Sequence, residues 1–117
     1  MSNRVSFMVK IFRIELEEVE NDIHALMDYS SRRFEKKEIS PYVWQENKAL
    51  LVKEVSCLKE LEGDLENWSP AGDKEDIASA VIELTEYLKN LVVKHGYPEL
   101  VSIVIDRISE KVSRYIE

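Results

Sequence analysis

One histidine of the sequence is flanked by carboxylates at a spacing typical of a helical face. Glu20 and Asp28 stand four residues before and after His24, so in a helix the three side chains would share one face and could offer ligands to a metal. Closed zinc sites use four ligands, chiefly Cys or His, and bundle di-iron sites use Glu-x-x-His pairs on two helices. Because neither pattern is present, we predict a solvated, salt-linked surface and no metal; a metal or enzymatic site here is an alternative.

Two other side chains have reactive chemistry of their own. His95 is expected at the end of a helix, where an imidazolium interacts favourably with free carbonyls. Cys57 is the single cysteine, falls beside an apolar stripe, and is expected to be a packed, inert thiol. No acid or nucleophile is spaced to converge on either one, and no phosphate-binding glycine loop or hydrolase elbow occurs. We therefore predict no catalytic residue, no cofactor and no enzymatic activity.

A basic cluster is formed by Arg32, Arg33, Lys36 and Lys37. Cations in the last turns of a helix complement the negative end of its dipole, which explains the cluster first. The chain as a whole has 23 Asp and Glu against 16 Lys and Arg, a net charge of −7, and such a charge repels nucleic acid and anionic membranes at long range. We expect neither as a partner; nucleic-acid binding through this cluster is an alternative.

The elements that position these residues are helices. The 117 residues are 44% hydrophobic and 33% charged and include only three Gly and three Pro, a composition typical of one ordered domain, here 1–117, with a single core. Apolar residues recur at steps of three and four in four segments. The spacing predicts helices over about 3–37, 41–68, 74–95 and 98–116.

Capping signals separate the four segments. Ser40 and Pro41 suit the N-cap and first position of the second helix. The 69–72 stretch, Ser-Pro-Ala-Gly, is a loop before Asp73, which is placed to cap the third helix. Gly96 suits the left-handed position that closes that helix. Helices joined by short loops predict an all-α, antiparallel up-down four-helix bundle with a long N-terminal hairpin and two shorter helices.

The apolar N-terminal segment does not resemble a targeting or membrane segment. Charged residues, among them Lys10 and Arg13, interrupt it, and no small-residue cleavage site follows. No apolar run approaches the roughly 18 residues that cross a bilayer. We expect a cytoplasmic protein without membrane contact.

The first helix has a second apolar strip, formed by Phe7, Ile11 and Ile14 and roughly opposite its main stripe. At 1.5 Å per residue this helix spans about 50 Å, whereas the third and fourth span about 30 Å each. The strip and the excess length predict a further contact surface, and we expect a two-fold homodimer. Trp44, near Tyr42, and Trp68 are candidate aromatic anchors of an interface.

The segment Leu50–Leu58, followed by Glu62 and the 69–72 loop, resembles the small flagellar export chaperones of the FliT type. The resemblance implies a short acidic helical bundle that holds unassembled partners by exposed apolar helix surface. An export-chaperone-like protein is therefore one alternative. From the residues themselves we expect a non-enzymatic protein–protein interaction module, such as an adaptor, an accessory subunit or a small chaperone, that acts as a homo-oligomer.

Overall fold

The computed structural model describes residues 3–71 and 76–116, and over these residues the chain forms four α-helices and no strand. The all-α four-helix bundle expected from the apolar periodicity is confirmed. Asp73, the expected cap of the third helix, lies outside the described residues; the expected helix start at residue 74 is wrong, because Asp76 is the N-cap and accepts a hydrogen bond from the Ala78 amide at 3.1 Å. The helices are α1 (Asn3–Glu35), α2 (Pro41–Glu66), α3 (Ile77–His95) and α4 (Glu99–Tyr115).

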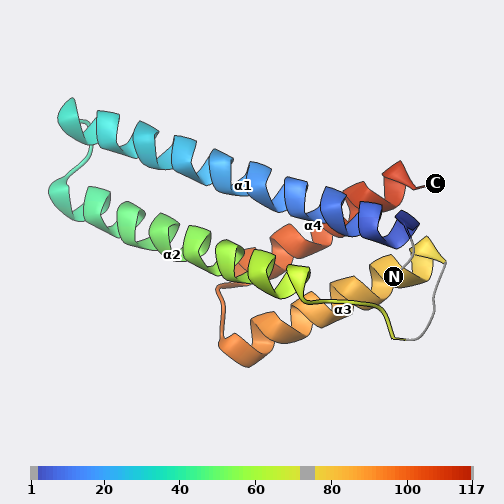
Figure 1. Ribbon diagram of the computed structural model, residues 1–117. Coiled ribbons are helices and arrows are strands. Elements are labelled where there is room, and N and C mark those ends of the chain that lie inside the picture. The colour runs from blue at the N-terminus through green and yellow to red at the C-terminus, as the bar shows by residue number, and fades with distance from the viewer. Residues whose placement is uncertain (1–2, 72–75, 117) are drawn as a thin grey trace.

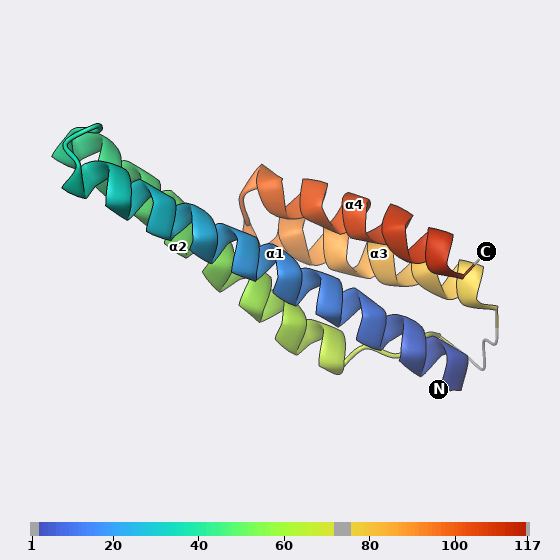
Figure 2. The same ribbon diagram turned by 90° about the horizontal axis from the view of Figure 1, so that it is seen from above.

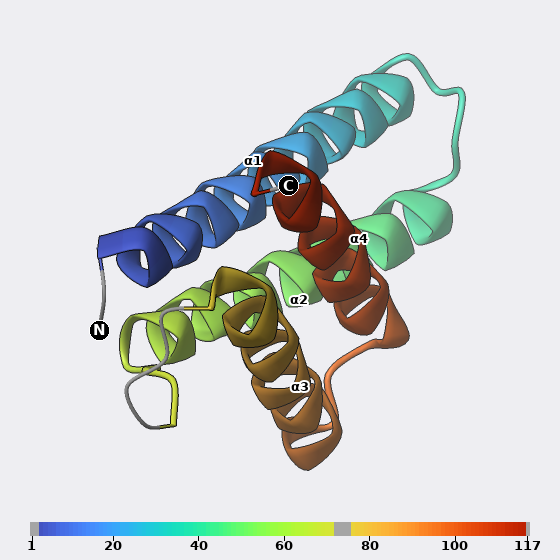
Figure 3. The same cartoon turned by 90° about the vertical axis from the view of Figure 1, so that its right-hand side faces the viewer.

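The four helices are arranged as two antiparallel hairpins of unequal length (Figure 1). The shorter hairpin, α3 and α4, lies against one half of the α1–α2 hairpin, and the other half projects beyond it (Figure 2). In Figure 3 the two hairpins run in different directions, so that their layers cross at an angle. Within the interface α1 packs against both α3 and α4, and α2 packs against α4. The result is an elongated molecule of 56 × 27 × 18 Å.

Local sequence sets the helix ends. Ser40 accepts a hydrogen bond from the Val43 amide at 3.1 Å, and Pro41 occupies the first turn of α2, as expected. Gly96 has φ 64° and ends α3 in the left-handed conformation. The predicted end of α1 at residue 37 is wrong by two residues, because Lys37 also adopts a left-handed conformation, φ 61°, and ends the helix at Glu35.

The core is made of buried apolar side chains from all four helices. In α1 these side chains extend only as far as Ile23, and in α2 they begin at Val55. These limits are consistent with the arrangement of the hairpins, because α3 and α4 lie against only one half of the α1–α2 hairpin (Figures 1 and 2). The fully buried large side chains are Val5, Met8, Phe12, Leu16, Leu58, Leu61, Leu65, Leu84, Leu88, Val101, Ile105 and Val112.

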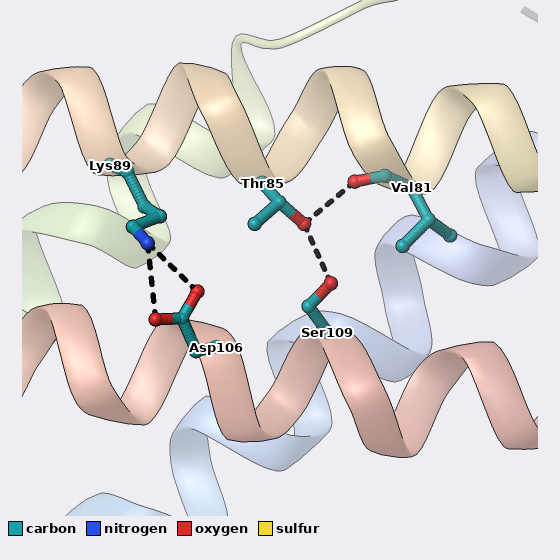
Figure 4. A network of polar contacts seen from close by, with 5 residues as sticks. All are labelled: Val81, Thr85, Lys89, Asp106 and Ser109. Carbon is teal, nitrogen blue, oxygen red and sulfur yellow. Dashed lines mark hydrogen bonds and ion pairs between the residues drawn. The ribbon is translucent and has the colours of Figure 1, made fainter.

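Polar contacts hold α3 and α4 in register (Figure 4). The Thr85 hydroxyl donates to the Val81 carbonyl oxygen at 2.7 Å, and its oxygen lies 2.8 Å from the Ser109 hydroxyl. One turn further along, the Lys89 ammonium binds both carboxylate oxygens of Asp106 at 3.0 and 3.1 Å. Because the Thr85–Ser109 and Lys89–Asp106 contacts join specific partners across the two helices, sliding α3 along α4 by a turn would break both of them.

Candidate functional site

The projecting half of the α1–α2 hairpin is nearly without a core. We call residues 24–53 the distal hairpin; within this stretch the only buried residue is Ser30, at 9% exposed. The cause is helix length: α1 spans about 50 Å, whereas α3 and α4 span about 28 and 26 Å, so roughly 20 Å of the long hairpin has nothing packed on it. A pair of helices alone cannot bury a full apolar stripe.

Polar and aromatic contacts take the place of a core in the distal hairpin. The Asn47 side-chain amide donates to the Ser30 hydroxyl at 3.3 Å, and the Trp44 indole N–H donates to the Ser31 hydroxyl at 3.4 Å. The Trp44 ring stacks on Phe34 with ring centroids 4.6 Å apart. These contacts hold the two helices together and leave their outer faces free.

A groove of about 220 Å³ runs between the two helices of the distal hairpin. Its exposed apolar side chains are Leu26, Tyr29 and Leu50, each a little more than half exposed. Arg33 provides the charge at the rim, where it packs over the Tyr29 ring at 5.8 Å and forms an ion pair with Glu38 at 3.3 Å. The lining residues are Leu26, Tyr29, Ser30, Arg33, Ile39, Asn47, Leu50 and Leu51.

The groove lies on the same face of the long hairpin as α3 and α4. In α1, Glu15 faces α4, because its carboxylate binds the Lys111 ammonium at 2.8 Å. Leu26 and Arg33 follow Glu15 by eleven and eighteen residues, about three and five helical turns, and therefore share its face. In α2, Leu50 stands two turns before Cys57, which is close enough to Tyr97 to affect its pKa. The groove thus continues the surface that the second hairpin covers.

The five expected interface residues are distributed over different environments. Phe7 is 63% exposed and Ile14 is also exposed, but Ile11 is half-buried against the core. The strip expected along α1 is therefore interrupted at Ile11. Trp44 lies in the distal hairpin with one ring face covered by Phe34. Trp68 is 6% exposed and packs in the core, so its indole offers no surface to a partner.

The structure does not bring His24, Glu20 and Asp28 together as a solvated surface. His24 and Asp28 are exposed, whereas Glu20 is buried at 6% exposed, so the expectation of one polar face is wrong for Glu20. The reason is that Glu20 turns toward α2, where it hydrogen-bonds Glu62. Among residues 3–71 and 76–116, no three His, Cys, Asp or Glu side chains are grouped as a metal site would require.

The Glu20–Glu62 pair is a feature that the sequence analysis missed. Burial, followed by the hydrogen bond and charge of Glu20, raises the pKa of Glu62 from 4.5 to about 7. One Glu62 oxygen, Oε1, is buried without a hydrogen-bond partner in the described structure. Arg13 offsets only part of this, because it forms its ion pair with Glu66 at 3.0 Å. The raised pKa favours the protonated form of Glu62 below about pH 7. No spacing within one helix could have revealed the pair, because Glu20 is on α1 and Glu62 is on α2.

The remaining reactive candidates have structural surroundings. Cys57 is buried, and burial, then the nearby Glu60 carboxylate, raises the pKa of its thiol. His95 is the last residue of α3 and stacks on Tyr97 with ring centroids 5.3 Å apart. Tyr97 donates a hydrogen bond to Glu60, which ties the α3–α4 connection to α2. No group with the geometry of a general base and nucleophile pair is formed by these residues.

The basic cluster lies at the tip of the distal hairpin. Arg32 and Arg33 are in the last turn of α1, and Lys36 and Lys37 are in the turn that follows. Over residues 24–53 there are six Lys and Arg against four Asp and Glu, a net charge of +2, while the rest of the chain has ten against 19, a net charge of −9. The exposed apolar groove is therefore on a net-basic part of a chain whose remainder is net acidic.

Comparison with known protein families, curated proteins and solved structures finds no significant match. The likeness of the segment Leu50–Leu58 to flagellar export chaperones stays a prediction. Within the described parts of the chain, no helix combines the length and the apolar character needed to span a bilayer. Function must therefore be argued from the distal hairpin itself.

Proposed function

We propose that this protein is a non-enzymatic protein–protein interaction module, such as an adaptor, an accessory subunit or a small chaperone, and that it contacts its partner through the distal hairpin. The observation that carries the proposal is that residues 24–53 bury a single side chain, Ser30, while Leu26, Tyr29 and Leu50 stand exposed around a groove. Exposed apolar surface of this kind, with a polar rim, is typical of protein contact sites.

The shape and lining of the groove favour a helix over a small molecule. Its volume of about 220 Å³ lies below the roughly 300–1,000 Å³ of most small-molecule sites. Arg33 is the one charged side chain among its lining residues, so the groove lacks the convergent acids and bases that position a substrate. An apolar channel between two parallel ridges of side chains fits the apolar face of a third helix.

The charge of the molecule supports a protein partner. A net charge of −9 outside the distal hairpin disfavours long-range attraction to nucleic acid or to an anionic membrane. The four cations at the tip are mixed with Glu35 and Glu38, and Arg33 is paired with Glu38. We therefore propose that no nucleic acid and no membrane surface is bound, and that the protein acts in the cytoplasm as a homo-oligomer.

The chaperone form of the proposal has one observation in its favour. The segment that resembles flagellar export chaperones begins with Leu50 and Leu51, and both line the groove. The rest of the segment, from Val55 to Leu58, belongs largely to the core. Exposed helix surface that holds an unassembled partner would then be located at the start of α2.

Site-specific photo-crosslinking tests the proposal. A photoreactive phenylalanine replaces Leu50 in the groove, and a matched variant carries it at Glu86, an exposed position on α3. We expect cross-links to protein, either a second copy or another chain, from position 50 and few from position 86. Equal yields at the two positions, or none at either, would show that the groove is not the contact surface.

A further inference from the structure

We propose that the groove is filled by the distal hairpin of a second copy of this chain, which packs antiparallel about a two-fold axis and completes a four-helix bundle between the two molecules. This inference rests on the proposed function and names the partner. It places Leu26, Tyr29 and Leu50 of each copy at the centre of the contact.

The face of the long hairpin that α3 and α4 cover is continuous with the groove. The half of the α1–α2 hairpin that lies farther from its tip is covered by a second antiparallel hairpin, α3–α4. The groove is the direct extension of that covered face. The missing occupant is therefore a two-helix layer about 20 Å long. The distal hairpin of a second copy is such a layer, and its uncovered length is by definition the same. A two-fold axis gives both copies the same contacts and leaves no unpaired surface for further growth.

The two ends of the uncovered region differ in charge. Its outer end carries the basic cluster Arg32, Arg33, Lys36 and Lys37. Its inner end, beside the α3–α4 connection, carries exposed Asp22 and Glu99 and the Glu60 carboxylate, which accepts the hydrogen bond of Tyr97, together with exposed Lys53 and Lys94. Antiparallel packing brings the basic cluster of each copy near these carboxylates, whereas parallel packing would place the two basic clusters together.

The size of the uncovered face suits a contact between two copies. Two helices side by side present a face about 20 Å wide and here about 20 Å long, so two copies bury on the order of 800–1,000 Å² in total. That area is at the low end for specific complexes and corresponds to a weak, reversible dimer. For this dimer we expect a dissociation constant in the micromolar range. Such a dimer can dissociate and expose the same groove to another chain.

The test is analytical ultracentrifugation of the purified protein across low micromolar to millimolar concentrations. The variant Leu26→Glu with Leu50→Glu introduces charges into the centre of the contact, and we expect a dissociation constant roughly 100-fold higher. The matched control is Ile82→Glu with Val93→Glu, two exposed apolar residues of α3 outside the groove, which should leave the dissociation constant unchanged. Circular dichroism of all variants verifies that they are folded.

A second measurement tests the antiparallel arrangement. Tyr29 is near the middle of the uncovered part of α1, so a two-fold axis there brings it close to its symmetry mate. In a Cys57→Ser background, Tyr29→Cys should form a disulfide-linked dimer under mild oxidation, and Glu86→Cys should not.

Three results would overturn the inference. A protein that is still monomeric at millimolar concentration would refute the dimer. If the photo-crosslinker at position 50 nevertheless captures another protein, the proposed function stands with a different partner. A dimer that dissociates in Phe7→Asp with Ile14→Asp, but not in the groove variant, would place the contact on the N-terminal part of α1. A groove-dependent dimer without the Tyr29→Cys disulfide would refute the antiparallel packing.

Discussion

The two halves of the α1–α2 hairpin have similar helical sequences but different environments. Between Val5 and Ile23, α1 buries a side chain at almost every turn against α2, α3 and α4. From residue 24 onward the same helix buries only Ser30, and serine–asparagine and tryptophan–phenylalanine contacts replace the core. The difference shows that a helix-forming pattern fixes local structure, whereas coverage by a neighbour decides whether an apolar side chain stabilises the fold or remains available for binding.

The largest effect should come from truncating a core side chain in the covered half. Phe12 is fully buried, and Phe12→Ala should lower the free energy of unfolding by about 3–5 kcal/mol, since it removes apolar contacts and leaves a cavity. Leu26→Ala, in the uncovered half, should change it by about 0.5 kcal/mol or less. Urea unfolding at low micromolar protein concentration, monitored by circular dichroism, measures the free energy of unfolding of both variants. Equal losses would mean that the distal hairpin is part of the cooperative core.

Amide hydrogen exchange should separate the two halves directly. Helix amides with few buried contacts around them open locally at low free energy. We expect the amides of residues 26–34 in the monomer to exchange roughly 100-fold faster than those of residues 8–20. Dimerisation through the groove should slow the first group and not the second. Uniform protection along α1 in the monomer would contradict the comparison.

The Glu20–Glu62 pair near the inner end of the distal hairpin should make stability depend on pH. The pKa of Glu62 is raised from 4.5 to about 7 in the folded protein, so folding favours the protonated form, and stability falls as the pH rises from about 4.5 to about 7. Glu62→Gln should therefore raise the free energy of unfolding by about 1–3 kcal/mol at pH 8 and change it little at pH 4.5.

Urea titrations of wild type and Glu62→Gln at the two pH values measure this effect. The control is Glu86→Gln, on the exposed face of α3, which should behave alike at both. A Glu62→Gln variant that is no more stable than wild type at pH 8 would show that the pair is not strained at that pH.

The smallest effects should come from the turns that end α1 and α3, one at the tip of the distal hairpin and one in the second hairpin. Lys37 and Gly96 both have positive φ, 61° and 64°, but only glycine adopts this conformation without strain. Gly96→Ala should destabilise by about 1 kcal/mol, and Lys37→Gly should stabilise by about 0.5–1 kcal/mol. Thermal unfolding measures both changes. If Gly96→Ala and Lys37→Gly shifted stability in the same direction, the two positions would not share the left-handed backbone conformation.

The sequence predicted the four helices and those ends that have a clear local cap, whereas the end of α2, at Glu66 and not 68, and the start of α3, at Ile77 and not 74, were misplaced. Ser40, Pro41 and Gly96 occupy their expected positions. The end of α1 was misplaced because a lysine in the left-handed conformation leaves no signal in the sequence. The fold class could also be predicted, because it depends on apolar periodicity and loop length, which are local features of the sequence.

The candidate site was harder to predict because it depends on coverage. Leu26 and Ser30 continue the apolar spacing of α1 without a break, so periodicity alone cannot show where α3 and α4 end. Ile11, expected on an outer strip, contacts the core because α4 packs beside α1. Glu20 was assigned to a solvated face for the same reason: its partner, Glu62, is on another helix.

The position of the chain ends has a mechanical consequence. Arg4 and Ile116 line one hollow at the end of the molecule opposite the tip. A stretching force applied to these two residues would therefore peel α1 away from α4 turn by turn, the geometry in which few contacts resist at once. The distal hairpin would bear no load until that separation is complete. Single-molecule pulling would then report the strength of the covered half alone.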